Sequence, residues 1–373
     1  MRFYCSLFVA ICLLGSCKPS GTDPCATEFD QLALLSHMGN QIILPRYADL
    51  YTKVQEMHTV ARAFSNDPTV SSLAEVRAKW QTAFLSWQRA YIFEFGPAET
   101  NDLRNQIGNF PAFSDRINDG INSGSFDISE PSYAYARGFV AMDYLLYGIA
   151  TTDTEIVRAY TDATTAANAK KYLTDVSAAI EKAVGATYTG WRADGGNYIG
   201  TFTTTQGLAT GNPISLLINQ YNAAYELFKN NKLGTPIGAK TSYVAAPTTV
   251  EALHSKISLK LMKEAVEASK ATFLGTSEKD GTAGIGLDDY LSTVQAEKEG
   301  AALEMTIEGQ YDLVLSALNG ITSSSLQDAI SSESEKVKAA YAVAQNMVVF
   351  IKTDLPAVLC VNITYVDNTD DGD

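Results

Sequence analysis

Residues 73–91 read LAEVRAKWQTAFLSWQRAY, and the apolar side chains in this stretch recur every three or four positions. That spacing places them on one face of an α-helix, where they can be buried together. The residues on this face are Leu73, Val76, Trp80, Phe84, Trp87 and Tyr91. Asn-Asp-Pro at 66–68 precedes the pattern and Gly-Pro at 96–97 follows it, and both sequences break helices. The stretch therefore predicts one long amphipathic helix.

Similar spacing runs through most of the chain. It predicts further helices over 29–58, 133–147, 167–184, 214–229, 250–273, 289–318 and 332–355. Glycines and threonines gather at 185–211 and indicate a long connection between two groups of roughly four helices, enough for a bundle each. We therefore expect an all-α protein with an N-terminal lobe at 28–190 and a C-terminal lobe at 191–373. Weak alternation at 358–366 indicates a short extended tail.

The N-terminus has the pattern of a bacterial export signal. Met1-Arg2 is followed by an apolar run at 3–14 and by small residues before Cys17. The run is shorter than the about 20 apolar residues that span a bilayer. Residues 14–17, Leu-Gly-Ser-Cys, also fit the lipobox, in which the cysteine becomes the lipidated first residue. An ordinary cleaved signal that happens to precede a cysteine is the alternative.

The lipobox interpretation assigns 1–16 to the signal and 17–27, rich in Pro, Ser, Gly and Thr, to a flexible tether. Acyl chains on Cys17 would hold the protein at a membrane surface without crossing it. We expect a bacterial cell-envelope protein that faces the periplasm or lies on the cell surface. Of the other cysteines, Cys25 and Cys360 remain in the mature chain, and in an oxidising compartment these two can form a disulfide.

The composition argues against one class of partner. The formal net charge is −14, from 42 acidic and 28 basic side chains. Such a surface repels phosphate backbones, so we expect no nucleic-acid partner. The same acidic balance weakly favours cationic partners such as metal ions, although it identifies no site.

Several segments together resemble the imelysin family, also called the M75 peptidase-like family. They are WQTAFLSWQRAYIFEFGPAE at 80–99, GFVAMDYLLYG at 138–148, LFKNNKLGTPIG at 227–238, VEALHSKIS at 250–258, GIGLDDYL at 284–291 and the ending VNITYVDNTDDGD at 361–373. The resemblance implies two helical lobes with a cleft between them, and a part in iron or other metal acquisition at the cell envelope. One family member was described as a peptidase.

This chain departs from the family at its Gly-x-His-x-x-Glu motif. Val140 stands where the family has His, and Asp143 stands where it has Glu. Positions i and i+3 of a helix face the same way, so His and Glu there can share a metal ion. Val140 offers no lone pair, and one carboxylate does not hold a transition metal without other ligands. The motif therefore gives no support to a metallopeptidase, and we expect no catalytic residues.

Asp143 lies on an apolar helix face and needs a partner if it is buried. Arg89 and Arg137 are the candidates for that partner. Two interpretations stay open: a structural carboxylate that joins two core helices, or a remnant site that binds a cation or small ligand in the cleft.

The remaining candidates rest on weaker patterns. The cleft candidates as a set are Asp143, Arg137, Glu94, Glu99, Arg89 and Asp288. Glu94 and Glu99 flank the Phe-Gly-Pro turn, while Asp288 and Asp289 follow Gly286 and can equally cap a helix. Glu251-x-x-His254 has the spacing of a di-iron half-motif without a second copy. His37 and His58 fit surface or core-edge positions.

These observations leave three hypotheses of function. The first is a non-catalytic binding lipoprotein for iron, haem or another metal, with its ligand between the lobes. The second is a surface interaction protein that binds other envelope proteins and has lost the metal site. The third is a metallopeptidase. Tyrosines at 133–147 suit core packing, or they line the cleft for a haem-like ligand.

Overall fold

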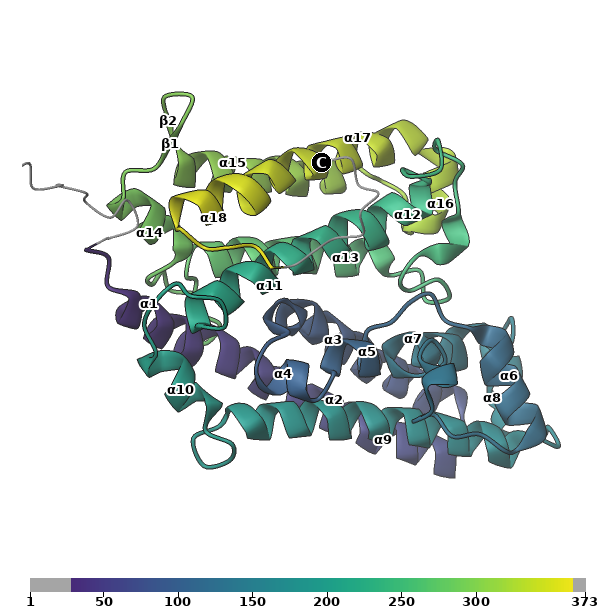
Figure 1. Cartoon of the computed structure of the whole chain (residues 1–373). Coiled ribbons are helices and arrows are strands. Elements are labelled where there is room, and N and C mark those ends of the chain that lie inside the picture. The colour runs from purple at the N-terminus through teal and green to yellow at the C-terminus, as the bar shows by residue number, and fades with distance from the viewer. Residues whose placement is uncertain (1–27, 365–373) are drawn as a thin grey trace, which may run out of the picture.

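The computed structural model describes residues 28–364, which fold into helices and one two-stranded hairpin (Figure 1). The all-α prediction is confirmed. The α-helices are α1 (Gln31–His37), α2 (Leu44–Asn66), α3 (Val70–Ala90), α4 (Pro97–Thr100), α5 (Leu103–Ile107), α6 (Ser114–Ser123), α7 (Gly138–Asp143), α8 (Asp153–Thr161), α9 (Ala166–Trp191), α10 (Tyr198–Thr204), α11 (Pro213–Leu227), α12 (Thr235–Ile237), α13 (Ser258–Phe273), α14 (Leu287–Thr293), α15 (Leu303–Asn319), α16 (Leu326–Ser332), α17 (Ser334–Val349) and α18 (Leu355–Val358).

Tighter and wider helical turns join or extend these helices. The 3₁₀ turns are η2 (Tyr91–Phe93), η3 (Pro131–Tyr133) and η6 (Pro247–Thr249). The π-helical turns are η1 (Met38–Ile43), η4 (Tyr144–Gly148), η5 (Phe228–Gly234) and η7 (Phe350–Asp354). Several of the π-helical turns continue a helix without a break, as η5 continues α11.

The lower layer in Figure 1 is built on three long helices, α2, α3 and α9, of which α2 packs against both others. Helix α3 begins at a capping box, because the Thr69 hydroxyl accepts the Ser72 N–H at 3.1 Å and Ser72 Oγ accepts the Thr69 N–H at 3.0 Å. Trp80 and Trp87 on its apolar face are almost completely buried. Burial of a large apolar side chain contributes about 1.5–3 kcal/mol, so this face anchors the layer.

The upper layer contains α11, α13, α15 and α17, with α15 packed on both α13 and α17. The two layers meet where α3 contacts α13 and where η2, which follows α3 directly, contacts α11. The end of α3 and η2 therefore lie at the boundary between the lobes.

Some helix boundaries differ from the prediction. The segment 250–257 forms turns, and α13 starts only at Ser258. The predicted helix at 289–318 is two helices, α14 and α15. A hairpin of β1 (Glu297–Lys298) and β2 (Ala301–Ala302) separates them. Both hairpin-turn residues are left-handed, with φ of 55° at Glu299 and 81° at Gly300. That conformation stops a helix.

Two further boundaries moved. The helix predicted over 133–147 starts later, at Gly138, after a 3₁₀ turn. The connection predicted at 185–211 is partly helical, because α9 extends to Trp191 and α10 lies within it. The lobe boundary at 190 stays a prediction.

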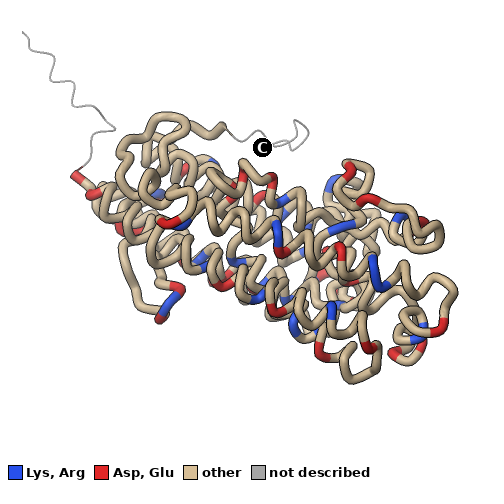
Figure 2. Tube along the Cα trace, turned by 90° about the horizontal axis from the view of Figure 1, so that it is seen from below, with Lys and Arg blue, Asp and Glu red and all other residues tan. Residues whose placement is uncertain are grey.

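Acidic and basic side chains are interspersed along both layers (Figure 2). Across residues 28–364, no helix is both long enough and apolar enough to span a bilayer.

Candidate functional site between the lobes

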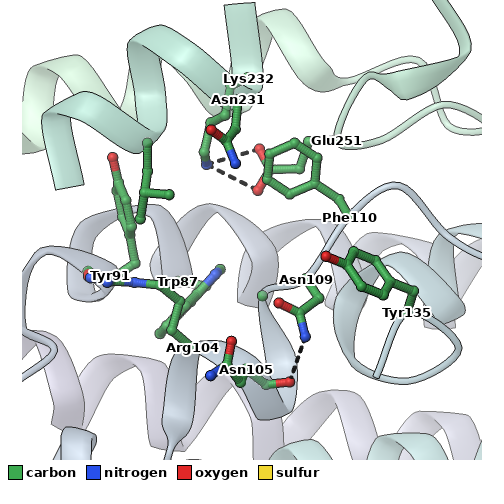
Figure 3. A pocket seen from close by; sticks show the side chains of 12 residues that line it. Trp87, Tyr91, Arg104, Asn105, Asn109, Phe110, Tyr135, Asn231, Lys232 and Glu251 are labelled. Atoms are coloured by element: carbon green, nitrogen blue, oxygen red, sulfur yellow. Dashed lines mark hydrogen bonds and ion pairs between the residues drawn. The ribbon is translucent and has the colours of Figure 1, made fainter. Parts of the chain in front are cut away.

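A pocket of about 140 Å³ opens where α3 and η2 face the upper layer (Figure 3). The N-terminal lobe supplies the end of α3, η2, α5 and the loops that follow α5 and precede α7. The C-terminal lobe supplies the end of α11, η5 and the turn at 250–257. The lining residues are Trp87, Tyr91, Arg104, Asn105, Gly108, Asn109, Phe110, Tyr135, Leu227, Asn231, Lys232 and Glu251.

A buried ion pair forms the polar wall of this pocket. Lys232 Nζ lies 3.0 and 2.9 Å from the two carboxylate oxygens of Glu251, and the two side chains are 5% and 3% exposed. Gln88, behind the pocket on α3, donates to Glu251 at 3.2 Å and accepts from Lys232. Burial lowers the pKa of the Lys232 ammonium, and the negative charge of Glu251 counteracts that shift.

Arg104 supplies a second cation, whose charge acts to lower the pKa of the Glu94 carboxyl against the larger effect of burial. Its Nη2 donates to the Tyr91 carbonyl at 2.8 Å and to Gln220 Oε1 at 3.5 Å, and its buried Nε has no acceptor. Among residues 28–364, no carboxylate lies within 4.0 Å of its guanidinium. Glu94 accepts the backbone N–H of Arg104 at 2.9 Å and so fixes the start of α5, which carries this side chain.

Aromatic side chains form the other walls. Trp87 on α3 and Tyr91 on η2 lie one helical turn apart in the sequence, with ring centroids 6.2 Å apart. Lys232 Nζ lies 4.8 Å from the Tyr91 ring centroid. At the mouth, Tyr135 is 39% exposed and stacks on Phe113 at 5.0 Å. The pocket therefore combines aromatic surfaces with a charged wall that carries two cations and one carboxylate.

The predicted partner of Asp143 is wrong. Its carboxylate oxygens accept the backbone N–H groups of His254 and Ser255, each at 2.9 Å, and the residue is 1% exposed. Burial raises the pKa of this carboxyl, while the hydrogen bonds from Ser255 and the His254 amide act to lower it. Asp143 thus joins the motif helix to the turn at 250–257 of the other lobe, and Val140 is buried core.

Arg89 and Arg137 have other partners. Arg89 lies between lobes in an ionic cluster with Asp49 at 2.6 Å and with Glu264 and Glu278, each at 3.1 Å. Arg137 donates to backbone carbonyls on the N-terminal lobe. Neither residue lines the pocket between the lobes.

The Glu251-x-x-His254 pattern does not form a helical half-motif, because residues 250–257 are turns. Glu251 points into the pocket, whereas the His254 ring packs on Gly148, where an added Cβ would lie 2.3 Å from Nδ1. Across residues 28–364, no three His, Cys, Asp or Glu side chains group closely enough to hold a metal ion.

The other candidates have structural positions. Glu99 is exposed in the first turn of α4. Asp289 accepts the Gly286 N–H at 2.9 Å and so caps α14, while burial and then the charge of Asp289 raise the pKa of Asp288 to about 6. Neither Glu94 nor Asp288 lines the pocket.

His37 and His58 lie at the edge of the core, as predicted. His37 Nε2 lies 2.7 Å from the Gly275 carbonyl, and His58 Nδ1 lies 2.9 Å from Ser177 Oγ. Cys360 is in a disulfide bond. Its predicted partner Cys25 and the predicted lipidation site Cys17 are outside the described residues, so both assignments stay predictions.

Sequence reasoning missed Arg104, Lys232 and Glu251 as a group. One signal was available for Lys232, because it lies with Lys229 at i,i+3 between the apolar residues Phe228 and Leu233. A lysine on an apolar face needs a buried carboxylate. Nothing in the sequence indicated that this carboxylate is Glu251.

Residues 43–348 match the family model described as Imelysin, peptidase M75. A curated relative, iron-regulated protein A of Synechococcus elongatus, is 25% identical over 108 residues, which cover 29% of this chain and 29% of that relative. The chain thus matches less than a third of that relative's length.

Two solved structures have the same fold. One is described as an iron-regulated protein A precursor from Parabacteroides distasonis ATCC 8503, with a TM-score of 0.74, 18% identity and coverage of 90% of this chain and 96% of that one. The other is an imelysin-like protein from Psychrobacter arcticum 273-4, with a TM-score of 0.67, 15% identity and coverage of 91% and 99%.

Proposed function

This chain belongs to the imelysin family, and we propose that it is a non-catalytic binding protein of iron acquisition that takes its ligand in the pocket between the lobes. The observation that carries the proposal is the charge of the pocket wall. Arg104 faces it with no carboxylate within 4.0 Å of its guanidinium among residues 28–364, while the Glu251 carboxylate is already paired with Lys232.

That charge arrangement favours iron as an anionic chelate over the bare ion. A free metal cation would meet two positive side chains and one carboxylate that is held by an ammonium. An oxygen-rich anionic chelate would instead give Arg104 a directly hydrogen-bonded anion, because guanidinium groups bind carboxylates through two parallel hydrogen bonds. The aromatic walls offer apolar surface to the rest of the ligand.

The size of the pocket limits the ligand. Its volume of about 140 Å³ is below the roughly 300–1,000 Å³ typical of small-molecule sites. A small chelate fits this volume better than haem does. Only the edge of haem that carries its carboxylates would enter the pocket. Haem therefore stays an alternative ligand.

The iron link is supported by similarity. The relative from Synechococcus elongatus and the structure from Parabacteroides distasonis are both described as iron-regulated protein A. The second of these is described as a precursor, which is consistent with export. We extend the proposal to a cell-envelope location through a lipid on Cys17.

Calorimetric titration tests this function on the purified chain from Lys18 onward, with iron(III) citrate, free iron(III) and haem as separate probes. We expect saturable binding of iron(III) citrate and at least about tenfold weaker binding by Arg104→Gln, the usual effect of losing a charged hydrogen bond. Arg158→Gln is the matched control, because Arg158 is 67% exposed, and it should bind like the wild type.

Three results would overturn the proposal. One is the absence of binding for every iron probe. Another is binding that Arg104→Gln and Arg158→Gln affect equally. The third is cleavage of unstructured peptides that a chelator abolishes, which would assign a metallopeptidase. A protein partner recovered from the cell envelope, together with no binding of any probe, would favour an interaction protein.

A further inference from the structure

A second and larger pocket lies within the N-terminal lobe, away from the boundary between the lobes. Its volume is about 300 Å³, at the lower limit of ordinary small-molecule sites. The lining residues are Asn101, Gln106, Ile128, Ser129, Arg137, Ala179, Lys182, Ala183 and Ala186. Two of these are basic and none is acidic, in a chain where acidic residues outnumber basic ones by 42 to 28.

The local backbone fixes Arg137 at this pocket. The next residue, Gly138, has φ of +74°, and a Cβ there would lie 2.5 Å from the Ile107 carbonyl oxygen. Only glycine allows the start of α7 to approach the end of α5 this closely. As a result, the Arg137 guanidinium lies over the α5 backbone, where it donates to the Asn105 carbonyl at 3.5 Å.

The guanidinium is buried without a counter-ion. Arg137 is 7% exposed, and its other hydrogen bonds go to the carbonyls of Ile128 at 3.1 Å and Ser129 at 3.2 Å. Its Nε has no acceptor. Within residues 28–364, no carboxylate lies within 4.0 Å of it. Buried charges in proteins are normally paired, because neutral acceptors do not offset the loss of hydration.

Burial also affects the pKa of Arg137. Burial lowers the pKa of the guanidinium, and the charge of Asp102 opposes that shift. The second cation, Lys182, projects from α9 as an exposed side chain on the same pocket. The lining of the pocket therefore carries two cations and no carboxylate, and the charge of Asp102 offsets that of Arg137 only in part.

We propose that this pocket binds a small organic acid, with its carboxylate held by Arg137 and Lys182. The carbon skeleton would pack on Ala179, Ala183 and Ala186, which lie on one face of α9 at i, i+4 and i+7. The small alanine side chains leave the space that such a skeleton needs. Among the polar lining residues, Gln106 offers its amide N–H groups to further oxygens of the ligand. The Asn101 amide donates to the Pro97 carbonyl at 2.7 Å, and the Ser129 hydroxyl donates to Asp127 at 2.6 Å. The apolar α9 face favours a carboxylic acid over inorganic phosphate, which has no apolar part.

Calorimetric titration of the purified chain with succinate tests this site. We expect saturable binding that Lys182→Gln weakens at least about tenfold, the usual effect of losing a charge-assisted hydrogen bond. The control is Lys170→Gln, which removes the same charge from the same helix away from the pocket and should leave binding unchanged. Because Lys182 is exposed, its substitution separates loss of binding from loss of folding.

A second variant, Arg137→Gln, should abolish binding, with the fold checked by circular dichroism. Three outcomes would overturn the assignment: no saturable heat with succinate, succinate binding that Lys182→Gln leaves intact, or phosphate bound through Lys182 while succinate is not. Succinate binding should also persist in Arg104→Gln, because that residue lines the other pocket. If Arg104→Gln loses succinate binding while Lys182→Gln and Arg137→Gln keep it, the acid binds in the pocket between the lobes and the assignment is wrong.

Discussion

Lys232 and Glu251 form a two-pronged ion pair between π-helical turn η5 and the turn at 250–257, with N–O distances of 3.0 and 2.9 Å and less than a tenth of either side chain exposed. Both charges were removed from water when the chain folded. Each is tolerated only because the other is present.

Glu251→Gln should therefore destabilise the protein by about 3 kcal/mol, because it leaves the Lys232 ammonium buried without a counter-ion. The double variant Lys232→Met/Glu251→Gln should recover much of that loss, since no buried charge remains. Urea unfolding measures both. Lys79 and Glu56 form an exposed pair for comparison, with side chains that are 41% and 49% exposed, and their neutralisation should change stability by less than about 1 kcal/mol. A double variant that is no more stable than Glu251→Gln alone would contradict this account.

Asp143→Ala removes the acceptor of two backbone N–H groups. Each buried N–H without a partner costs about 1–3 kcal/mol, so we expect a comparable loss of stability and faster hydrogen exchange at the amides of His254 and Ser255. Asp143→Asn keeps one acceptor oxygen, so its stability should lie between that of Asp143→Ala and that of the wild type. Unchanged exchange at these two amides would show that Asp143 does not fix the turn.

Gly138→Ala should destabilise the protein by at least about 1–2 kcal/mol, because a side chain at positive φ is strained and its Cβ would clash with the Ile107 carbonyl. Gly309→Ala should have the opposite effect on stability. Gly309 lies within α15, and a Cβ there meets no atom within 4 Å. Alanine is the better helix former, so Gly309→Ala should stabilise by about 0.5–1 kcal/mol. Thermal unfolding of the two variants distinguishes them, and equal shifts would contradict the prediction.

Asp288 should make the folded protein less stable as the pH rises. Burial and the neighbouring Asp289 raise its pKa from 3.8 to about 6 in the folded protein, so the folded state holds this proton more tightly than the unfolded state. The resulting stabilisation is full below pH 3.8 and is lost as the pH rises through about 6. Asp288→Asn should therefore raise the melting temperature at about pH 8, and the gain should shrink at about pH 5. Asp119→Asn, at an exposed site, should show no such change between the two conditions.

Local patterns predicted the long helices well. The face of residues 73–91 became the buried face of α3, because periodicity reports which side of a helix meets the core. The same rule failed at 250–257. There, His254 and Ser255 direct their backbone N–H groups to a carboxylate 111 and 112 positions away, and no local pattern encodes such a contact.

The candidate site was the least predictable part. Arg104, Lys232 and Glu251 come from three separated segments, and only the packing of α3 and η2 against the upper layer brings them together. Asp143 was rightly expected to need a partner. Its partner turned out to be backbone, which any sequence offers, so the choice of Arg89 or Arg137 could not be checked before the fold was known.

The turn at 250–257 contacts the N-terminal lobe through Glu251 to Gln88, through two backbone N–H groups to Asp143 and through the His254 ring, which packs on Gly148 and Tyr144. Separation of the lobes along this line must break all of these contacts together, so opening there is cooperative and not gradual. Entry to the pocket then depends on its rim, where Phe110 and Tyr135 belong to loops, and loops move within nanoseconds to microseconds. We expect the residence time of a bound ligand to follow the mobility of these two rings, while the lobes themselves stay in place.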